Sequence, residues 1–178
     1  YGDKIVPIFI SSMVKGSTIN NSDVEILKAL IKPQNIQEVT TKWNSQRQDL
    51  QLAFIEVTGN IRHSEVAQRM LAASTSKDTK VKKAALKVLR NVVSDKNLEA
   101  VLKILDKETS SSSVRYLQAA AAECLLLSEK AVVMDVASRL NTTRNDKLLG
   151  ALAKTSRIEA FPAIKKDIFS KDAEVQKN

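Results

Sequence analysis

The amino-acid sequence predicts an all-α fold, a right-handed α-α superhelix of about five antiparallel helix pairs. Apolar residues recur at the spacing of one helix face along most of the chain. Glycine and proline are scarce, with 4 and 3 among 178 residues, so the chain has little of the turn chemistry that β-hairpins need. Segments that read as helix pairs recur about every 31 to 35 residues, as in an α-solenoid. An irregular helical bundle with accidental self-similarity is the alternative.

The clearest helix pair lies between Thr79 and Leu105, in the stretch TKVKKAALKVLRNVVSDKNLEAVLKIL. A polar break at Ser94-Asp95 separates two amphipathic helices and is short enough to force a hairpin-like reversal. Small residues of the neighbouring units align with this pair, and Ala53, for example, precedes Ala84 by 31 residues. The apolar stripes are Val81, Ala84, Ala85, Val88, Leu89 and Val92 on the first helix and Leu98, Val101, Leu102 and Leu105 on the second.

The N-terminal part of the chain is less regular. Residues 3–14 read as one helix, with Pro7 either in its first turn or as a kink. Ser22 and Glu25 have the spacing of a capping box, in which a hydroxyl and a carboxylate satisfy each other's backbone amides. This box predicts a second helix that starts near Ser22 and runs to Ile31.

Three further signals predict where later helices begin. Residues 33–43 start with Pro33, which suits a first helical turn because its missing amide proton has no partner there. Ser45 and Gln48 have capping-box spacing and predict the start of the next helix. The pair Ser156 and Glu159 does the same near the C-terminus.

The chain shows no internal domain boundary. We therefore expect one α-solenoid domain over residues 1–178, with irregular helices in 1–45 and repeated helix pairs in 46–178. The low-complexity run ETSSSS, residues 108–113, is expected to be a mobile connector, and residues 171–178 either begin another helix or form a frayed tail. Because the chain starts with tyrosine rather than methionine, we expect it to be a segment of a larger protein.

Residues with catalytic or metal-binding chemistry are few. His63 is the only histidine, and its polar neighbours suit an exposed position at a helix start better than the base of a catalytic triad. Cys124 is the only cysteine and lies in an apolar helix, where a buried and inert thiol is expected. One histidine and one cysteine do not supply a zinc ligand set, and the chain has no glycine-rich phosphate loop. We expect no enzyme activity and no cofactor.

The net charge of +8 is concentrated in parts of the chain, with +4 between residues 79 and 110. Four basic residues in that stretch share one helix face, which could follow phosphates or an acidic protein. The preceding unit has Leu52 and Glu56 at the corresponding positions, so the basic face does not continue along the repeats. Trp43 is the only tryptophan, which leaves little for base stacking. The candidate binding residues are Lys80, Lys83, Lys87 and Arg90.

The segment from Asp78 to Leu105 resembles a HEAT-type repeat, in particular the short bacterial form first associated with phycobilin lyases. The resemblance extends over residues 47–75 and 114–165. It departs from the family pattern after the first helix, where the usual glycine survives as Gly59 but is Arg90 in the next unit. The resemblance implies a helical scaffold or binding module, and no residue match carries the lyase activity over to this chain.

The function we expect is a non-enzymatic scaffold built of HEAT-like repeats that binds a protein partner. One alternative is nucleic-acid binding through the basic helix face, and another is an accessory domain of an exported carbohydrate-active protein. Apolar faces on end repeats could also support self-association. No apolar run is long enough to cross a bilayer, and the sequence leaves both a cytoplasmic and an exported location open.

Overall fold

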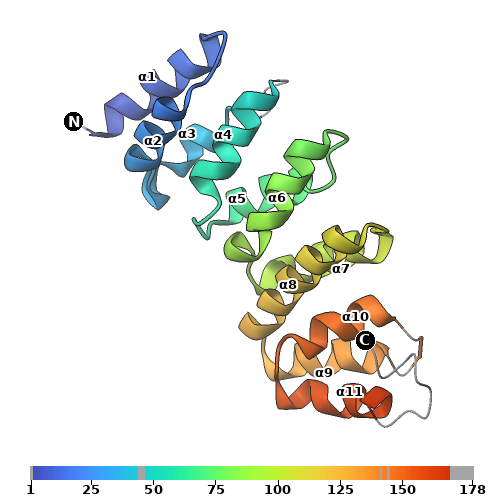
Figure 1. The fold of residues 1–178 in the computed structure, drawn as a ribbon. Helices are drawn as coiled ribbons and strands as arrows, with labels where there is room; N and C mark the ends of the chain where they lie inside the picture. Colours follow the sequence, from blue (N-terminus) through green and yellow to red (C-terminus); the bar gives the residue numbers. More distant parts are fainter. Residues whose placement is uncertain (1, 44–46, 141, 144, 169–178) are drawn as a thin grey trace. The chain divides into compact units, whose positions relative to one another are not determined.

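The computed structural model describes residues 2–43, 47–140, 142–143 and 145–168. These residues form eleven α-helices and three short 3₁₀ helices, with no strand among them, which confirms the predicted all-α class (Figure 1). The chain divides into two compact units, residues 1–93 and 94–178, and each is described by itself.

The first unit contains two rows of helices. In one row α2 packs against α4, and α4 packs against α6. In the other row α1 contacts α3, and α3 contacts α5, while α5 also packs against α6 (Figure 1). Each helix therefore lies beside the helix two places along the chain. The elements are α1 (Gly2–Lys15), α2 (Asn21–Leu30), the 3₁₀ helix η1 (Pro33–Asn35), α3 (Ile36–Thr40), α4 (Gln48–Thr58), α5 (Ser64–Ala73) and α6 (Thr79–Val92).

The second unit repeats this relationship. Helix α8 packs against α7 and against α10, and α11 contacts both α9 and α10 (Figure 1). The elements are the 3₁₀ helix η2 (Asp95–Asn97), α7 (Leu98–Lys107), α8 (Ser111–Leu127), α9 (Lys130–Arg139), α10 (Asp146–Ala153), the 3₁₀ helix η3 (Ile158–Ala160) and α11 (Phe161–Ile168).

The core is mostly aliphatic, as the low aromatic content predicts. In the first unit the one close aromatic pair between described residues is Trp43 with Phe54, whose ring centroids lie 5.8 Å apart, and both side chains are buried. In the second unit the alanine-rich helix α8 buries Ala120, Ala121 and Cys124 completely. Small side chains let neighbouring helices approach α8 closely, while Leu126 and Leu127 at the end of this helix are exposed.

Two of the predicted helix starts are wrong by one or two residues. The capping box of α2 is formed by Asn20 and Asp23, not by Ser22 and Glu25: the Asp23 amide donates to Asn20 Oδ1 at 2.9 Å and the Asn20 amide to Asp23 Oδ2 at 3.0 Å. Asparagine supplies the same kind of side-chain acceptor as serine, and here it comes two residues earlier. Ser156 adopts a φ of 52° and does not cap a helix, and η3 begins after Arg157.

The other predicted starts have different outcomes. Pro33 is the first residue of η1, as its fixed φ favours. Pro7 lies inside α1, beyond its first turn. Ser45 lies outside the described residues, and α4 begins at Gln48 after Arg47.

The expectation of a connector over residues 108–113 is wrong in its second half. Glu108 follows α7, and its Oε1 accepts from the amides of Thr109 and Ser110, each at 3.0 Å. Residues 111–113 form the first turn of α8. The serine hydroxyl forms hydrogen bonds with nearby backbone groups. This disfavours serine in helix interiors but favours it at helix starts, so a serine run is compatible with a first turn.

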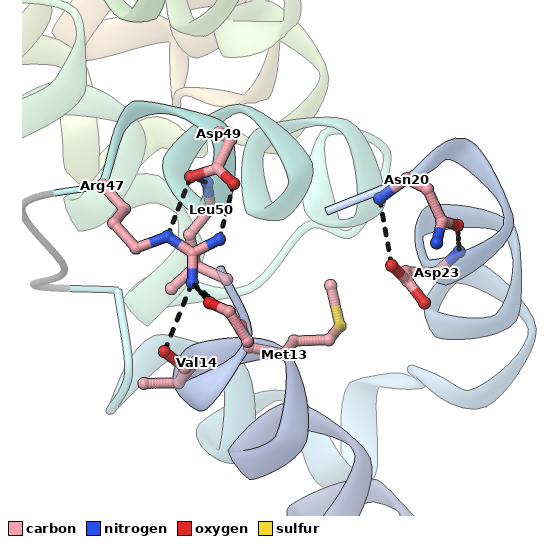
Figure 2. A network of polar contacts seen from close by, with 8 residues as sticks. Met13, Val14, Asn20, Asp23, Arg47, Asp49 and Leu50 are labelled. Carbon is pink, nitrogen blue, oxygen red and sulfur yellow. Dashed lines mark hydrogen bonds and ion pairs between the residues drawn. The ribbon is translucent and has the colours of Figure 1, made fainter. Parts of the chain in front are cut away.

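Two arginines, which the sequence analysis did not single out, cap the C-terminal ends of helices. Arg47 Nη1 donates to the carbonyls of Met13 (3.2 Å) and Val14 (3.3 Å), at the end of α1, and its Nη2 lies 2.5 Å from Asp49 Oδ2 (Figure 2). Nη1 also donates to the Gly16 carbonyl. A guanidinium placed there satisfies carbonyls that have no partner within the helix. Its positive charge also opposes the negative end of the helix dipole.

Arg157 repeats this arrangement at the end of α8. Its Nη1 donates to the carbonyls of Leu125 (3.0 Å) and Ser128 (2.7 Å), and its Nε donates to Glu159 at 3.2 Å. In both cases the acidic residue that orients the guanidinium lies two positions after the arginine. These ion pairs fix the start of one helix against the end of an earlier one.

Candidate functional site

Helix α6 carries all four residues that the sequence singled out for binding. Its N-terminus is capped by Asp78, whose Oδ1 accepts from the amides of Lys80 at 2.9 Å and Val81 at 3.1 Å. Gln48, at the start of α4, also donates to this carboxylate. The hydrogen bonds from the Val81 amide and from Gln48 hold the pKa of Asp78 below its ordinary value. The acidic group that caps α6 thus already accepts hydrogen bonds from two amides and from Gln48.

The inward side of α6 fixes the orientation of this helix. Val81, Ala85 and Leu89 are buried. Val88 is half-buried and lies against Gly59 at the end of α4, where an added Cβ would be 2.9 Å from Val88 Cγ1. Near the C-terminal end of α6, the side-chain amide of Asn91 donates to Asn60 Oδ1 at 3.0 Å, on the flank that faces α4. Because these contacts occupy the inner and α4-facing sides, the remaining side of α6 faces outward.

The predicted basic residues occupy this outward side and are all exposed. We call them the basic ridge of α6: Lys80, Lys83, Lys87 and Arg90. The ridge extends over about 15 Å, given a rise of about 1.5 Å per residue. In the part of the chain that the structure describes, none of the four forms an ion pair, and α6 contains no acidic residue. The structure therefore brings these side chains together as the sequence predicted.

Carboxylates on the neighbouring helix of the first unit are engaged elsewhere. On α4, Glu56 lies 2.7 Å from Lys28 Nζ, which also contacts Glu25 at 2.7 Å, and these two acids raise the pKa of the lysine. Asp49, at the start of α4, is bound by Arg47, which lowers the pKa of the carboxyl group. Glu25, Glu56 and Asp49 are thus bound by cations of the same row, whereas α6 contains no acidic residue.

Cys124 is buried as predicted, and His63 lies at a helix start as predicted but is half-buried rather than exposed. His63 is the N-cap residue of α5, where its Nδ1 accepts from the Glu65 amide at 3.3 Å. Cys124 is completely buried within α8. The two residues belong to different units.

The second unit contains a small pocket with a volume of about 290 Å³. Its lining includes the apolar side chains of Leu105 and Leu148. Arg139, at its rim, lies 2.7 Å from Glu99 and 2.9 Å from Asp135. The pocket therefore has a cation whose charge two carboxylates already balance, which leaves it little to offer an anionic ligand.

Within the described ranges, no group of three or more histidine, cysteine, aspartate or glutamate side chains is placed to hold a metal ion. No helix in the described part of the chain combines the length and apolar character that crossing a bilayer requires. No protein-family model, curated protein or solved structure matches the chain. The function is therefore inferred from the residues and contacts of this chain.

Proposed function

We propose that this chain is a non-enzymatic interaction module made of HEAT-like helix pairs, with a protein as its partner. The single observation that carries the proposal is the packing of alternate helices within each unit, α2 on α4 on α6 and α8 on α10. Such neighbour-by-neighbour packing is how α-solenoids are built, and their function is to present an extended surface of successive helices. A right-handed superhelix belongs to the same proposal.

The chemistry of the described residues supports a binding role. Aliphatic side chains and closely approaching backbones hold adjacent helices together, as Gly59 and Val88 do between α4 and α6. The side chains that face outward are left for recognition. In such a module affinity comes from shape and charge on several helices rather than from one reactive centre.

Reconstitution with purified components tests this function. The chain, immobilised through one terminus, is exposed to an extract of its source cells after nuclease treatment, and candidate partners are then expressed and purified separately. The expected result is direct, saturable binding of one purified protein to the chain, measured by calorimetry. If no candidate binds directly, or if only nucleic acid is retained when the nuclease is left out, the proposal is wrong.

Nucleic-acid binding is the second candidate, because the basic ridge of α6 has four exposed cations. Two observations favour a protein instead. The adjacent helix α4 presents the ion-paired Glu56 rather than further cations, so the phosphate contacts on which nucleic-acid affinity depends would be confined to one helix. Trp43 and Phe54, which could stack on bases, are buried against each other.

A further inference from the structure

We propose that the basic ridge of α6 docks an acidic helical segment of the partner protein, one with carboxylates spaced three and four residues apart. This inference rests on the proposed function and adds the surface and the chemical class of the partner. It follows from the exposure and spacing of Lys80, Lys83, Lys87 and Arg90, none of which forms an ion pair with another described residue.

The spacing of the ridge matches the surface of another helix. The four cations occur at positions i, i+3, i+7 and i+10, so they form one line along α6, with steps of about 4.5 and 6 Å at the rise of an α-helix. A helix with glutamate or aspartate at the same intervals presents a line of carboxylates with the same steps. Laid alongside α6, it places each carboxylate opposite one cation.

The described carboxylates near the ridge in the first unit are held by other groups, although the charge of Asp78 also acts on Lys80. Asp78 accepts from the amide groups at the start of α6 and from Gln48. Glu56 is paired with Lys28, and Asp49 with Arg47. Like charges in a row repel one another, so an incoming line of carboxylates removes this repulsion as well as forming new ion pairs. A partner with acidic side chains is thus the one that gains most from this surface.

A duplex or single strand fits the ridge less well. The cations lie on one helix and extend over about 15 Å at about 1.5 Å per residue, and α4 beside it carries the carboxylate of Glu56 within a Lys28 ion pair. A phosphate backbone that continued across the row would meet this acidic group. A short acidic helix can end before it.

The test measures binding of the whole chain to designed probes. The main probe is an alanine-based peptide of about 20 residues, long enough to be helical, with four glutamates at the ridge spacing. A second peptide has the same composition with the glutamates distributed around the helix. A random DNA duplex and a single-stranded RNA are the nucleic-acid probes. Affinity is measured by fluorescence anisotropy at several salt concentrations.

Two double variants carry the same change in charge. Lys83→Glu with Lys87→Glu reverses the centre of the ridge, whereas Lys96→Glu with Lys103→Glu reverses two exposed lysines on η2 and α7. Circular dichroism checks that both remain helical. We expect the ridge variant to bind the main peptide at least about tenfold more weakly, because two attractive pairs become repulsive. The control variant should lose about twofold or less.

Three results would overturn the proposal: equal losses in the two variants, equal affinity for the two peptides, or tighter binding of either nucleic acid than of the main peptide at the same salt concentration. Absence of peptide binding at low salt would also overturn it. The proposed role of the ridge and the proposed function of the chain can be contradicted separately. If a purified partner bound the ridge variant as tightly as the wild type, only the role of the ridge would be wrong.

Discussion

The guanidinium of Arg157 and the carboxylate of Glu159 form an ion pair, with Nε 3.2 Å from Oε2, at a point where Arg157 also binds the C-terminal end of α8. Their side chains are only 20% and 13% exposed. Arg47 and Asp49 form the corresponding pair at the end of α1. In each unit, therefore, one arginine links the end of one helix to the start of a later element.

Replacing Arg157 should destabilise the second unit. In Arg157→Ala the carbonyls of Leu125 and Ser128 lose a charged donor, and we expect the free energy of unfolding to fall by about 1–3 kcal/mol. Arg157→Lys should recover only part of this loss, because an ammonium cannot contact both carbonyls and the carboxylate in the geometry of a planar guanidinium. Urea unfolding followed by circular dichroism measures the change.

Lys154→Ala is the matched control for the Arg157 variants, since Lys154 is an exposed basic residue a few positions earlier. Its stability should stay close to that of the wild type. If Arg157→Ala were no less stable than this control, the role assigned to the Arg157 cap would be wrong.

Acid should weaken both arginine caps. Arg157 lowers the pKa of Glu159, and Arg47 lowers that of Asp49. A carboxylate with a depressed folded-state pKa adds stability above its unfolded-state pKa, which is about 4.3 for glutamate and 3.9 for aspartate. That stability is lost as the pH falls through the folded-state pKa. We expect the free energy of unfolding to decrease from about pH 5 downward.

The pH effect can be assigned with two neutralising variants. Glu159→Gln should flatten the decrease below pH 5, while Glu129→Gln, at an exposed position in the same unit, should leave its slope unchanged. Urea unfolding at several pH values gives both slopes. Identical pH profiles for the two variants would rule out a contribution from the Glu159 pair.

Substitution by alanine should have different effects on stability at Gly59 and Gly150, the two glycines that lie at helix contacts. A Cβ at Gly59 would lie 2.8 Å from the Ile55 carbonyl oxygen and 2.9 Å from Val88 Cγ1, so the backbone or α6 must shift. We expect Gly59→Ala to cost about 1–3 kcal/mol through overpacking. A Cβ at Gly150 would meet only the end of Gln118, at 2.2 Å, which can rotate away.

Gly150→Ala should therefore change stability by no more than about 1 kcal/mol, since the better helix propensity of alanine offsets the loss of one hydrogen bond from Gln118 to the Lys147 carbonyl. Thermal unfolding of the two variants in parallel checks the contrast. A larger loss for Gly150→Ala than for Gly59→Ala would contradict the packing described between α4 and α6.

The thiol of Cys124 should react slowly in the native protein. It is completely buried in α8, so a thiol reagent reaches it only when this part of the chain opens. We expect Ellman's reagent to react much more slowly in buffer than in urea, and faster with Arg157→Ala than with the wild type. A native rate equal to that in urea would show that Cys124 is not buried.

Much of the helix pattern follows from the sequence, because each long helix buries a regular apolar stripe. In α6 the predicted Val81, Ala85 and Leu89 are buried, and the cations fall on the opposite side. Ala84 and Val88 belong to the predicted stripe but are only half-buried, because they turn toward the flank of the helix. Helical periodicity identifies a face and leaves its edges uncertain.

The arginine caps could not be predicted in this way. Arg157 contacts residues about 30 positions earlier in the chain, and such a contact forms only because of how the helices pack. The only local signal is an arginine two residues before an acidic residue, at the start of an element, and such pairs are common on solvated surfaces. The predicted start of α2 is wrong for a local reason. Asn20 with Asp23 and Ser22 with Glu25 both have the spacing of a capping box, and the spacing alone does not select the earlier pair that the structure shows.

Lateral packing of α4 on α6 and of α8 on α10 underlies the proposed surface, and nuclear Overhauser spectra of the labelled chain test it most directly. We predict cross-peaks between the Gly59 α-protons and the Val88 methyl groups, and between the Gly150 α-protons and the Gln118 side-chain amide. If both sets were absent, and α4 and α8 instead showed contacts only to helices adjacent in sequence, the alternate-helix arrangement would be wrong.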